Sequence, residues 1–537
     1  MTRNRFDTRN RSDWAALAGT FLLLSSTAIV TPAVAQTSGS SLSAGAMVPS
    51  YGAMPPSKGG RALQGAAGLD SPTAQAATDP RATVGSDGMV SLRPGGGPTD
   101  SLPNALADAY LGNATLGSAR YGQRAVDEGV PQARGGWRPH VTVEADISRG
   151  VEHFEMMAPR SHQWLTSRGA VLTVLQPIYH GGSIGADVER AEAEVAAGEA
   201  KLSSTTQQQL LQAAQSYLDV YRDEKVLGLS ENLVQVLSTN LRDVQSTYKA
   251  GAATETDTSQ AAARLQGAVA SRFAAGGNLA TSRAGFQTLV GRSPAPNLTA
   301  PALLGTLPKT EAEAQALAAT HNPALDQVRQ RLEAAKHQVD YLRGSLLPQV
   351  DGVVQAQHQD DFNDDRGDLF NSATVGIQMT MPLYEGGSTY SQIRAAREAV
   401  SQAQTDLIQR QREVTQYVTA AWAALQSAQA EQAQFRAQIG ANQIALRTTN
   451  DQVNAGTRTR LDLLNAQQEL FSSRVNLVAA QHDTLLAEFK LETAEGMFTP
   501  EALGLAVQSY DAKVHRDAVR DKWIGTMPVD DDVPQPK

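Results

Sequence analysis

Two short stretches of the sequence, Gln176-Pro-Ile-Tyr-His-Gly-Gly-Ser183 and Met381-Pro-Leu-Tyr-Glu-Gly-Gly-Ser388, are near-copies of each other. Their prolines, Pro177 and Pro382, are 205 residues apart. The same separation recurs in three pairs further along the chain: Gly251 and Gly456, Asp257 and Asp462, and Gly291 and Gly496. A shared register over about 115 residues without an insertion indicates an internal duplication.

Upstream of these stretches the two halves also match, at a separation of 209 residues. Arg138-Pro139-His-Val141 corresponds to Leu347-Pro348-Gln-Val350. Because the separation changes between the two proline positions, the length difference lies in one loop. We therefore expect residues 101–300 and 301–505 to form two structural repeats, each a helix, a β-hairpin and a long helical hairpin. Residues 506–537 would then be a C-terminal periplasmic tail.

The hydrophobic period changes within each repeat. Residues 101–133 and 310–346 have the helical period, with Ala-rich apolar faces. Alternation of period two follows, which predicts strands. In the first half the predicted strands cover residues 141–148 and 170–176. In the second half one predicted strand begins at Pro348 and the other ends at Met381, and a polar loop at 359–368 separates them.

One face of each predicted strand is apolar and the other is polar. Strands of about ten residues with this pattern are typical of a transmembrane β-barrel with a wet interior. The alternative is a soluble hairpin with one core face. The mean hydropathy of −0.31 excludes a polytopic helical membrane protein but does not exclude a barrel.

After each Gly-Gly pair the helical period returns. From Leu461 to Leu485 the positions of one stripe step alternately by three and four residues, and all but Gln468 and His482 are apolar, which is the pattern of a coiled-coil seam. A helix over 183–248 would span about 100 Å at 1.5 Å per residue. The chain must then reverse, and glycine is suited to the left-handed residue that ends a helix. The residues that can cap the returning helices are Thr256 or Asp257, and Thr459 or Asp462.

The N-terminal residues predict export. Residues 1–35 combine a basic start, the apolar stretch 14–30 and an Ala33-Val34-Ala35 cleavage site, which predicts a signal peptide; a membrane anchor is the alternative. Residues 36–100 are rich in Gly, Ser, Ala and Pro and are expected to be disordered. Removal of the signal takes the net charge from −9 to −11, which disfavours nucleic acid as a partner.

Composition excludes several kinds of chemistry. The chain has no cysteine, so a disulfide scaffold, a thiol nucleophile and a Cys-based metal site are excluded. The histidines form no zinc motif, and no phosphate-binding loop is present. The acidic stretch Asp361-Phe-Asn-Asp-Asp365 suggests a calcium loop, but Arg366 occupies the position that requires glycine, so a solvated outer loop is favoured. We expect no enzyme, cofactor or metal.

Two copies of helix, strand, loop, strand and long helical hairpin behind a signal peptide resemble the TolC family of outer-membrane factors. The resemblance depends on Pro382-Leu-Tyr-Glu-Gly-Gly387 at the strand-to-helix junction and on the helical turn that begins at Ala455-Gly-Thr-Arg458. It covers residues from about 101 to 505. The stretch Val519-Arg-Asp-Lys-Trp-Ile-Gly525 is similar to the tail of members that serve type I protein secretion.

The resemblance implies a mixed α+β membrane protein that forms a homotrimer. Each chain would give four strands to a 12-stranded outer-membrane β-barrel, continued by a long antiparallel α-helical coiled-coil tunnel in the periplasm. The implied partners are outer-membrane lipid, a periplasmic adaptor protein and, through it, an inner-membrane ABC or proton-driven transporter. Low aromatic content, 5%, fits such thin helical walls.

The resemblance also assigns roles to individual residues. Arg458 matches the arginine that links neighbouring hairpins at the closed periplasmic end, and Thr256 and Asp257 match its partners. Asp462 matches a ring aspartate, while Asn465 and Val453 depart from the second ring aspartate and the linking tyrosine. For Asp462 the alternative is a carboxylate that faces a helix N-terminus. The adaptor-docking tips would hold Gly251, Gly456 and Thr457, and the strand-to-helix junctions would hold Pro177, Gly181, Gly182, Pro382, Gly386 and Gly387.

Two hypotheses for function follow from these features. The first is the exit duct of a tripartite type I secretion or small-molecule efflux system, gated by helix movement at the periplasmic end. The second is a trimeric coiled-coil protein that covers the surface or spaces the envelope. A duct should insert into bilayers and conduct ions, whereas a spacer should not.

Overall fold

The computed structural model describes residues 82–84, 90–92, 99–153, 162–302, 307–363 and 367–528. The chain divides into two units, 1–74 and 75–537, and all described residues belong to the second. The expected signal peptide at 1–35 lies outside the described residues. In the expected disordered range, 36–100, the described residues form short strands: β1 (Ala82–Val84) pairs with β2 (Val90–Leu92), and β3 (Thr99–Asp100) pairs with β6 (Asn297–Leu298).

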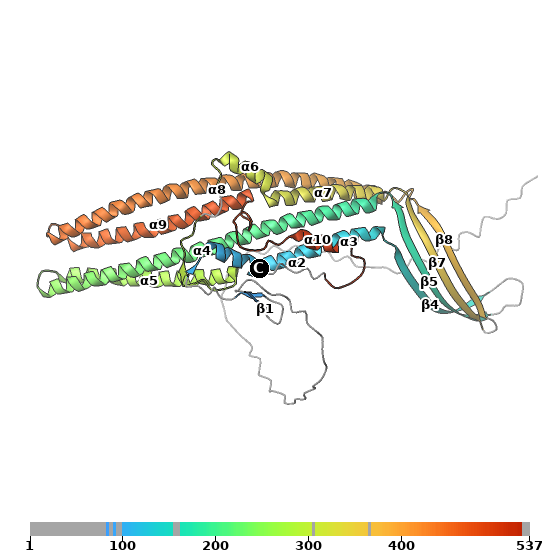
Figure 1. Cartoon of the computed structure of the whole chain (residues 1–537), viewed down its shortest axis with the longest axis horizontal. Helices are drawn as coiled ribbons and strands as arrows, with labels where there is room; N and C mark the ends of the chain where they lie inside the picture. The colour runs from blue at the N-terminus through green and yellow to red at the C-terminus, as the bar shows by residue number, and fades with distance from the viewer. Residues whose placement is uncertain are drawn as a thin grey trace, which may run out of the picture. The chain divides into compact units, whose positions relative to one another are not determined.

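Two long helical hairpins dominate the described chain (Figure 1). The first consists of α4 (Ser183–Lys249, 67 residues) and α5 (Glu255–Val290, 36 residues). The second consists of α8 (Ser388–Asn454, 67 residues) and α9 (Arg460–Glu495, 36 residues). Every boundary of the second hairpin lies 205 residues after that of the first, so the repeat predicted from the sequence is present in the structure.

The shorter helices of each repeat are interrupted where the sequence predicted continuous helical stretches. Residues 101–133 form α1 (Leu102–Gly112), α2 (Ala114–Asp127) and α3 (Gly129–Arg134), and a 3₁₀ turn, η1, covers Gly135–Trp137. Residues 310–346 form α6 (Glu311–His321) and α7 (Pro323–Gly344).

An asparagine causes the matching break in each repeat. The side-chain oxygen of Asn113 accepts hydrogen bonds from two amides at the start of α2, and that of Asn322 does so from Ala324 at the start of α7. The Nδ2 of Asn113 donates to the Leu289 carbonyl at 3.1 Å, and that of Asn322 donates to the Ala494 carbonyl at 2.8 Å. Each asparagine therefore ends one helix, starts another and ties both to the end of its hairpin.

The four long strands form one antiparallel sheet in the order β4-β5-β7-β8. They are β4 (His140–His153), β5 (His162–His180), β7 (Gln349–Asn363) and β8 (Gly367–Thr380). The strands are longer than predicted, and the polar loop predicted at 359–368 was wrong for most of its length, because β7 continues to Asn363 and β8 begins at Gly367. Polar residues there keep pairing, since ladder hydrogen bonds use only the backbone.

The register places like residues in rows across all four strands. One row crosses the sheet from strand to strand and consists of Val141, Val174, Val354 and Val375. The next row consists of Thr142, Thr173, Gln355 and Thr374. Because successive side chains point to opposite faces, the first row lies on an apolar face and the second on a polar face.

Buried contacts concentrate where the helices of the two repeats meet. The largest cluster joins α1, α4, α5 and α9, and includes Tyr217, Phe286 and Phe489. Beside it, the buried guanidinium of Arg292 lies between Asp100 and Asp108, with N–O distances of 2.7 and 2.6 Å. None of the helices that the structure describes is both long and apolar enough to cross a membrane.

Candidate functional site at the helical tips

The tip of each long hairpin is a tight helix-ending turn around one glycine. Gly251 and Gly456 have φ of +77° and +73°, which is the left-handed conformation that glycine adopts without strain. The amide of Gly251 donates to the Tyr248 carbonyl and the amide of Ala252 to the Thr247 carbonyl. The second tip repeats this pair of bonds, with Thr457 in the place of Ala252. Both tips are therefore Schellman motifs, and the sequence correctly identified their glycines.

The returning helices both begin with a capping box. Thr254 caps α5, where it exchanges hydrogen bonds with Asp257, and Thr459 caps α9, where it exchanges them with Asp462. The prediction that Thr256 or Asp257 caps this helix was wrong, because both lie inside α5 and the N-cap, whose hydroxyl accepts from the Asp257 amide, is Thr254. The spacing Thr-x-x-Asp was the signal in the sequence.

The capping boxes keep both carboxylates charged. The Thr459 hydroxyl and amide donate to Asp462 Oδ2 at 2.8 and 3.1 Å and hold the pKa of Asp462 below its ordinary value of 3.8. The Thr254 amide and hydroxyl lower the pKa of Asp257 in the same way. The alternative for Asp462, a carboxylate at a helix start, thus describes its contacts within one chain. That contact is compatible with a charged ring, because the side chain stays ionised.

The link predicted for Arg458 does not form within the described chain. Arg458 is exposed, and no hydrogen bond or ion pair between described residues joins it to Thr256 or Asp257. Instead Arg264 Nη2 donates to Asn465 Oδ1 at 3.0 Å, which connects α5 to α9, and Arg460 Nη2 donates to Thr247 Oγ1 at 3.4 Å, which connects α9 to α4. Sequence reasoning missed both arginines, although Arg264 lies two helical turns after Asp257 on the same face.

The strand-to-helix junctions differ between the repeats in how closely they are packed. Gly181 and Gly182 in the first, and Gly386 and Gly387 in the second, all have positive φ, between 62° and 82°. A Cβ on Gly181 would lie 2.2 Å from the Gly344 carbonyl oxygen, whereas a Cβ on Gly386 would have no atom within 4 Å. Pro177 lies at an irregularity in the β5–β7 ladder, and Pro382 follows β8.

Comparison with known proteins identifies the class to which this fold and these tips belong. The family model for outer membrane efflux proteins matches residues 105–292 and 315–497, so the chain belongs to that family. Its members are channel proteins, not enzymes, and the resemblance to the TolC family is confirmed.

Individual relatives agree with this assignment. The chain is 33% identical over 428 residues to the outer membrane efflux protein BepC of Brucella suis, a match that covers 80% of this chain and 92% of BepC. It is 27% identical over 199 residues to the alkaline protease secretion protein AprF of Pseudomonas aeruginosa, which covers 36% of this chain and 40% of AprF. The solved structure of the outer membrane protein VceC of Vibrio cholerae superimposes with a TM-score of 0.63 at 20% identity, over 74% of this chain and 96% of VceC. The predicted fold class is therefore confirmed, and the protein is an outer-membrane channel.

Proposed function

We propose that this protein is the exit duct of a tripartite type I secretion or small-molecule efflux system, formed by a homotrimer and gated by helix movement at its periplasmic end. The observation that supports it best is the sheet, whose apolar face is exposed on both edge strands. Ile147 on β4 is 72% exposed, and Val375 on β8 is 83% exposed. Side chains of this kind are stable in lipid and costly in water.

The open edges of the sheet support closure by other copies. Among the described strands β4 and β8 each pair on one side only, so four strands in lipid would leave a row of backbone groups without partners. Three copies would join these edges into a barrel of 12 strands. The second repeat supports the same conclusion, because α8 exposes large side chains such as Tyr417 and Ile444 that nothing in the described chain covers.

The tips supply the elements of a gate and of a docking surface. In a trimer, three copies of Asp462 around one axis would narrow the entrance and favour cations over anions. Arg458 is exposed and is free to reach Thr256 and Asp257 on a neighbouring copy. The turns at Gly251, Gly456 and Thr457 would face a periplasmic adaptor, which in turn would connect the duct to an inner-membrane transporter in the cell envelope.

Single-channel recording tests the duct. Purified protein in planar bilayers should conduct, and Arg458→Ala should raise the open probability by removing the links that close the entrance. If neither the native protein nor Arg458→Ala conducts, the protein is not a duct, and the envelope-spacing hypothesis would take its place.

Selectivity tests the ring. Asp462→Asn keeps an oxygen that accepts the bonds from Thr459 but removes the charge, so the preference for cations should fall. Asp451→Asn is the matched control, because Asp451 is an exposed acidic residue of the same tip that we do not place in the ring. Equal selectivity in Asp462→Asn and the native channel would refute the ring.

A further inference from the structure

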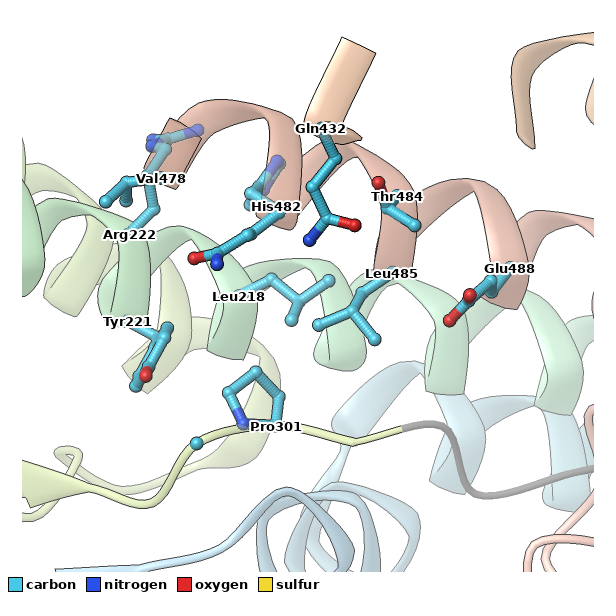
Figure 2. A pocket seen from close by; sticks show the side chains of 12 residues that line it. Leu218, Tyr221, Arg222, Pro301, Gln432, Val478, His482, Thr484, Leu485 and Glu488 are labelled. Carbon is cyan, nitrogen blue, oxygen red and sulfur yellow. The ribbon is translucent and has the colours of Figure 1, made fainter. Parts of the chain in front are cut away.

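The seam between α4 and α9, where the two repeats meet, has a polar gap between two apolar contacts. On the side of the gap away from the helical tips, Leu218 of α4 and Phe489 of α9 belong to one buried cluster. Towards the tips, Leu233 of α4 and Leu464 of α9 belong to another. Between them lies a cavity of about 340 Å³ with Leu218, Arg222, His482 and Leu485 in its wall, so apolar packing is interrupted there (Figure 2).

His482 bridges the two helices at this cavity. Its side chain is only 7% exposed, and both ring nitrogens contact carboxylates: Nε2 lies 3.0 Å from Asp219 Oδ1 on α4, and Nδ1 lies 2.9 Å from Asp483 Oδ1 on α9. A carboxylate only accepts hydrogen bonds, so both ring nitrogens must carry protons to satisfy this arrangement. The geometry therefore requires the charged imidazolium.

We propose that His482 is a proton-operated clasp. When it is charged it holds α9 against α4, and when it loses its proton it releases the part of the α8–α9 hairpin between His482 and the tip. Release does not leave a buried charge behind. Asp219 also contacts Arg222 on its own helix at 2.9 Å, and Asp483 is 63% exposed, so each carboxylate keeps a partner or water. On deprotonation the ring loses its charge and one of its two donors, so its attraction to Asp219 across the repeats weakens.

The charges around the ring favour its protonation. On α4, Asp219 attracts the imidazolium and Arg222 opposes it; on α9, Asp483 attracts it, and Glu488 is a further carboxylate in the cavity wall. The residue from α8 in that wall, Gln432, is neutral. Burial lowers the pKa of His482, but the hydrogen bonds to Asp219 and Asp483 outweigh it, and the pKa is raised above 6.5.

The sign of the pH effect follows from this shift. A histidine whose pKa is raised in the folded seam stabilises that seam fully below about 6.5, its ordinary value, and the stabilisation is lost as pH rises through the raised pKa. The clasp is therefore closed in mildly acidic solution and opens towards alkaline solution.

The duplication shows that the clasp is not a general feature of the fold. With the repeat separation of 205, His482 corresponds to Gly277, Asp483 to Asn278 and Asp219 to Ala424. None of these three residues can titrate near neutral pH. Only the second hairpin carries the histidine, so the two hairpins respond differently to protons.

Cysteine labelling tests the clasp without any need for channel activity, so its failure is distinct from failure of the proposed duct. Because the chain has no cysteine, one reporter can be introduced at a time. Ala268→Cys places a thiol in the buried cluster of Leu233 and Leu464, and Gln235→Cys supplies an exposed reference on α4. The ratio of their maleimide rates cancels the common effect of pH on thiolates.

In the full-length protein this ratio should rise severalfold between about pH 5.5 and about pH 8, as the imidazolium loses its proton. His482→Asn should give a high ratio at both pH values, and His482→Lys, which stays charged, a low ratio at both. His337→Asn is the matched control, because His337 pairs with Glu189 at 3.0 Å away from this seam, and it should keep the rise. A flat native ratio, a rise that persists in His482→Asn or a rise lost in His337→Asn would overturn the clasp.

Discussion

Charged residues inside this thin-walled protein differ in whether the fold supplies a partner. The Arg292 guanidinium is neutralised by two buried aspartates. Glu495, at the end of α9, is 1% exposed, and its Oε1 has no hydrogen-bond partner among the described residues. Burial, together with the nearby Glu492 and Glu313, raises the pKa of Glu495 from 4.5 to about 7.

This shift predicts that Glu495→Gln stabilises the protein at neutral and alkaline pH. A carboxyl whose pKa is raised on folding costs stability as pH rises from about 4.5 to about 7, and the full cost is present above that range. The substitution should raise the free energy of unfolding at pH 8 by the order of 3 kcal/mol and change it little at pH 4.5.

Denaturant unfolding at the two pH values measures the effect, with exposed Glu501→Gln as the control. The first repeat supports the expectation, since Val290 occupies the position equivalent to Glu495. A gain equal at both pH values would show that charge is not the cause.

At the scale of elements, periodicity was enough to predict the two hairpins, because one repeated apolar stripe decides where each long helix lies. It missed the breaks at Asn113 and Asn322, because a capping asparagine leaves the apolar period unchanged; the sequence signal at the second break is Pro323, directly after Asn322, since proline favours the first position of a helix. The Arg264–Asn465 bond at the tips was missed because it joins residues 201 positions apart that only tertiary packing brings together.

The capping box of α5 predicts that Thr254 and Thr256 differ in how much they stabilise the start of the helix. Thr254→Ala should destabilise the first turn of α5 by about 1 kcal/mol, because it removes the acceptor for the Asp257 amide. Thr256→Ala should leave the stability of this turn unchanged to within a few tenths of a kcal/mol or increase it, since alanine is the better helix former. Amide hydrogen exchange in residues 255–260 measures both. Equal exchange in the two variants would show that the box does not hold the tip.

At the scale of the whole molecule, the duplication predicts the register in which β8 of one copy pairs with β4 of a neighbouring copy. Within the chain, β5 of the first repeat pairs with β7 of the second, and Leu172 lies opposite Ala356. The equivalent of Leu172 one repeat later is Ile377 on β8, and the equivalent of Ala356 one repeat earlier is Ile147 on β4. If the barrel closes by repeating the same pairing, Ile377 lies directly opposite Ile147 of a neighbouring copy.

Oxidation of Ile147→Cys/Ile377→Cys should therefore link three chains covalently, and gel electrophoresis under denaturing conditions should show the trimer. Directly opposed residues on antiparallel strands have Cα atoms about 4.5–5.5 Å apart, which suits a disulfide. The control is Ile147→Cys/Gln378→Cys, which moves one thiol to the other face of the sheet and should not cross-link. A trimer from the control pair, or none from the first, would mean that the barrel closes in another register, and a one-residue shift would turn the apolar face of β8 inward. Because that shift would place Val375, Ile377 and Met379 in the wet lumen, the apolar row itself favours the register in which the two isoleucines meet.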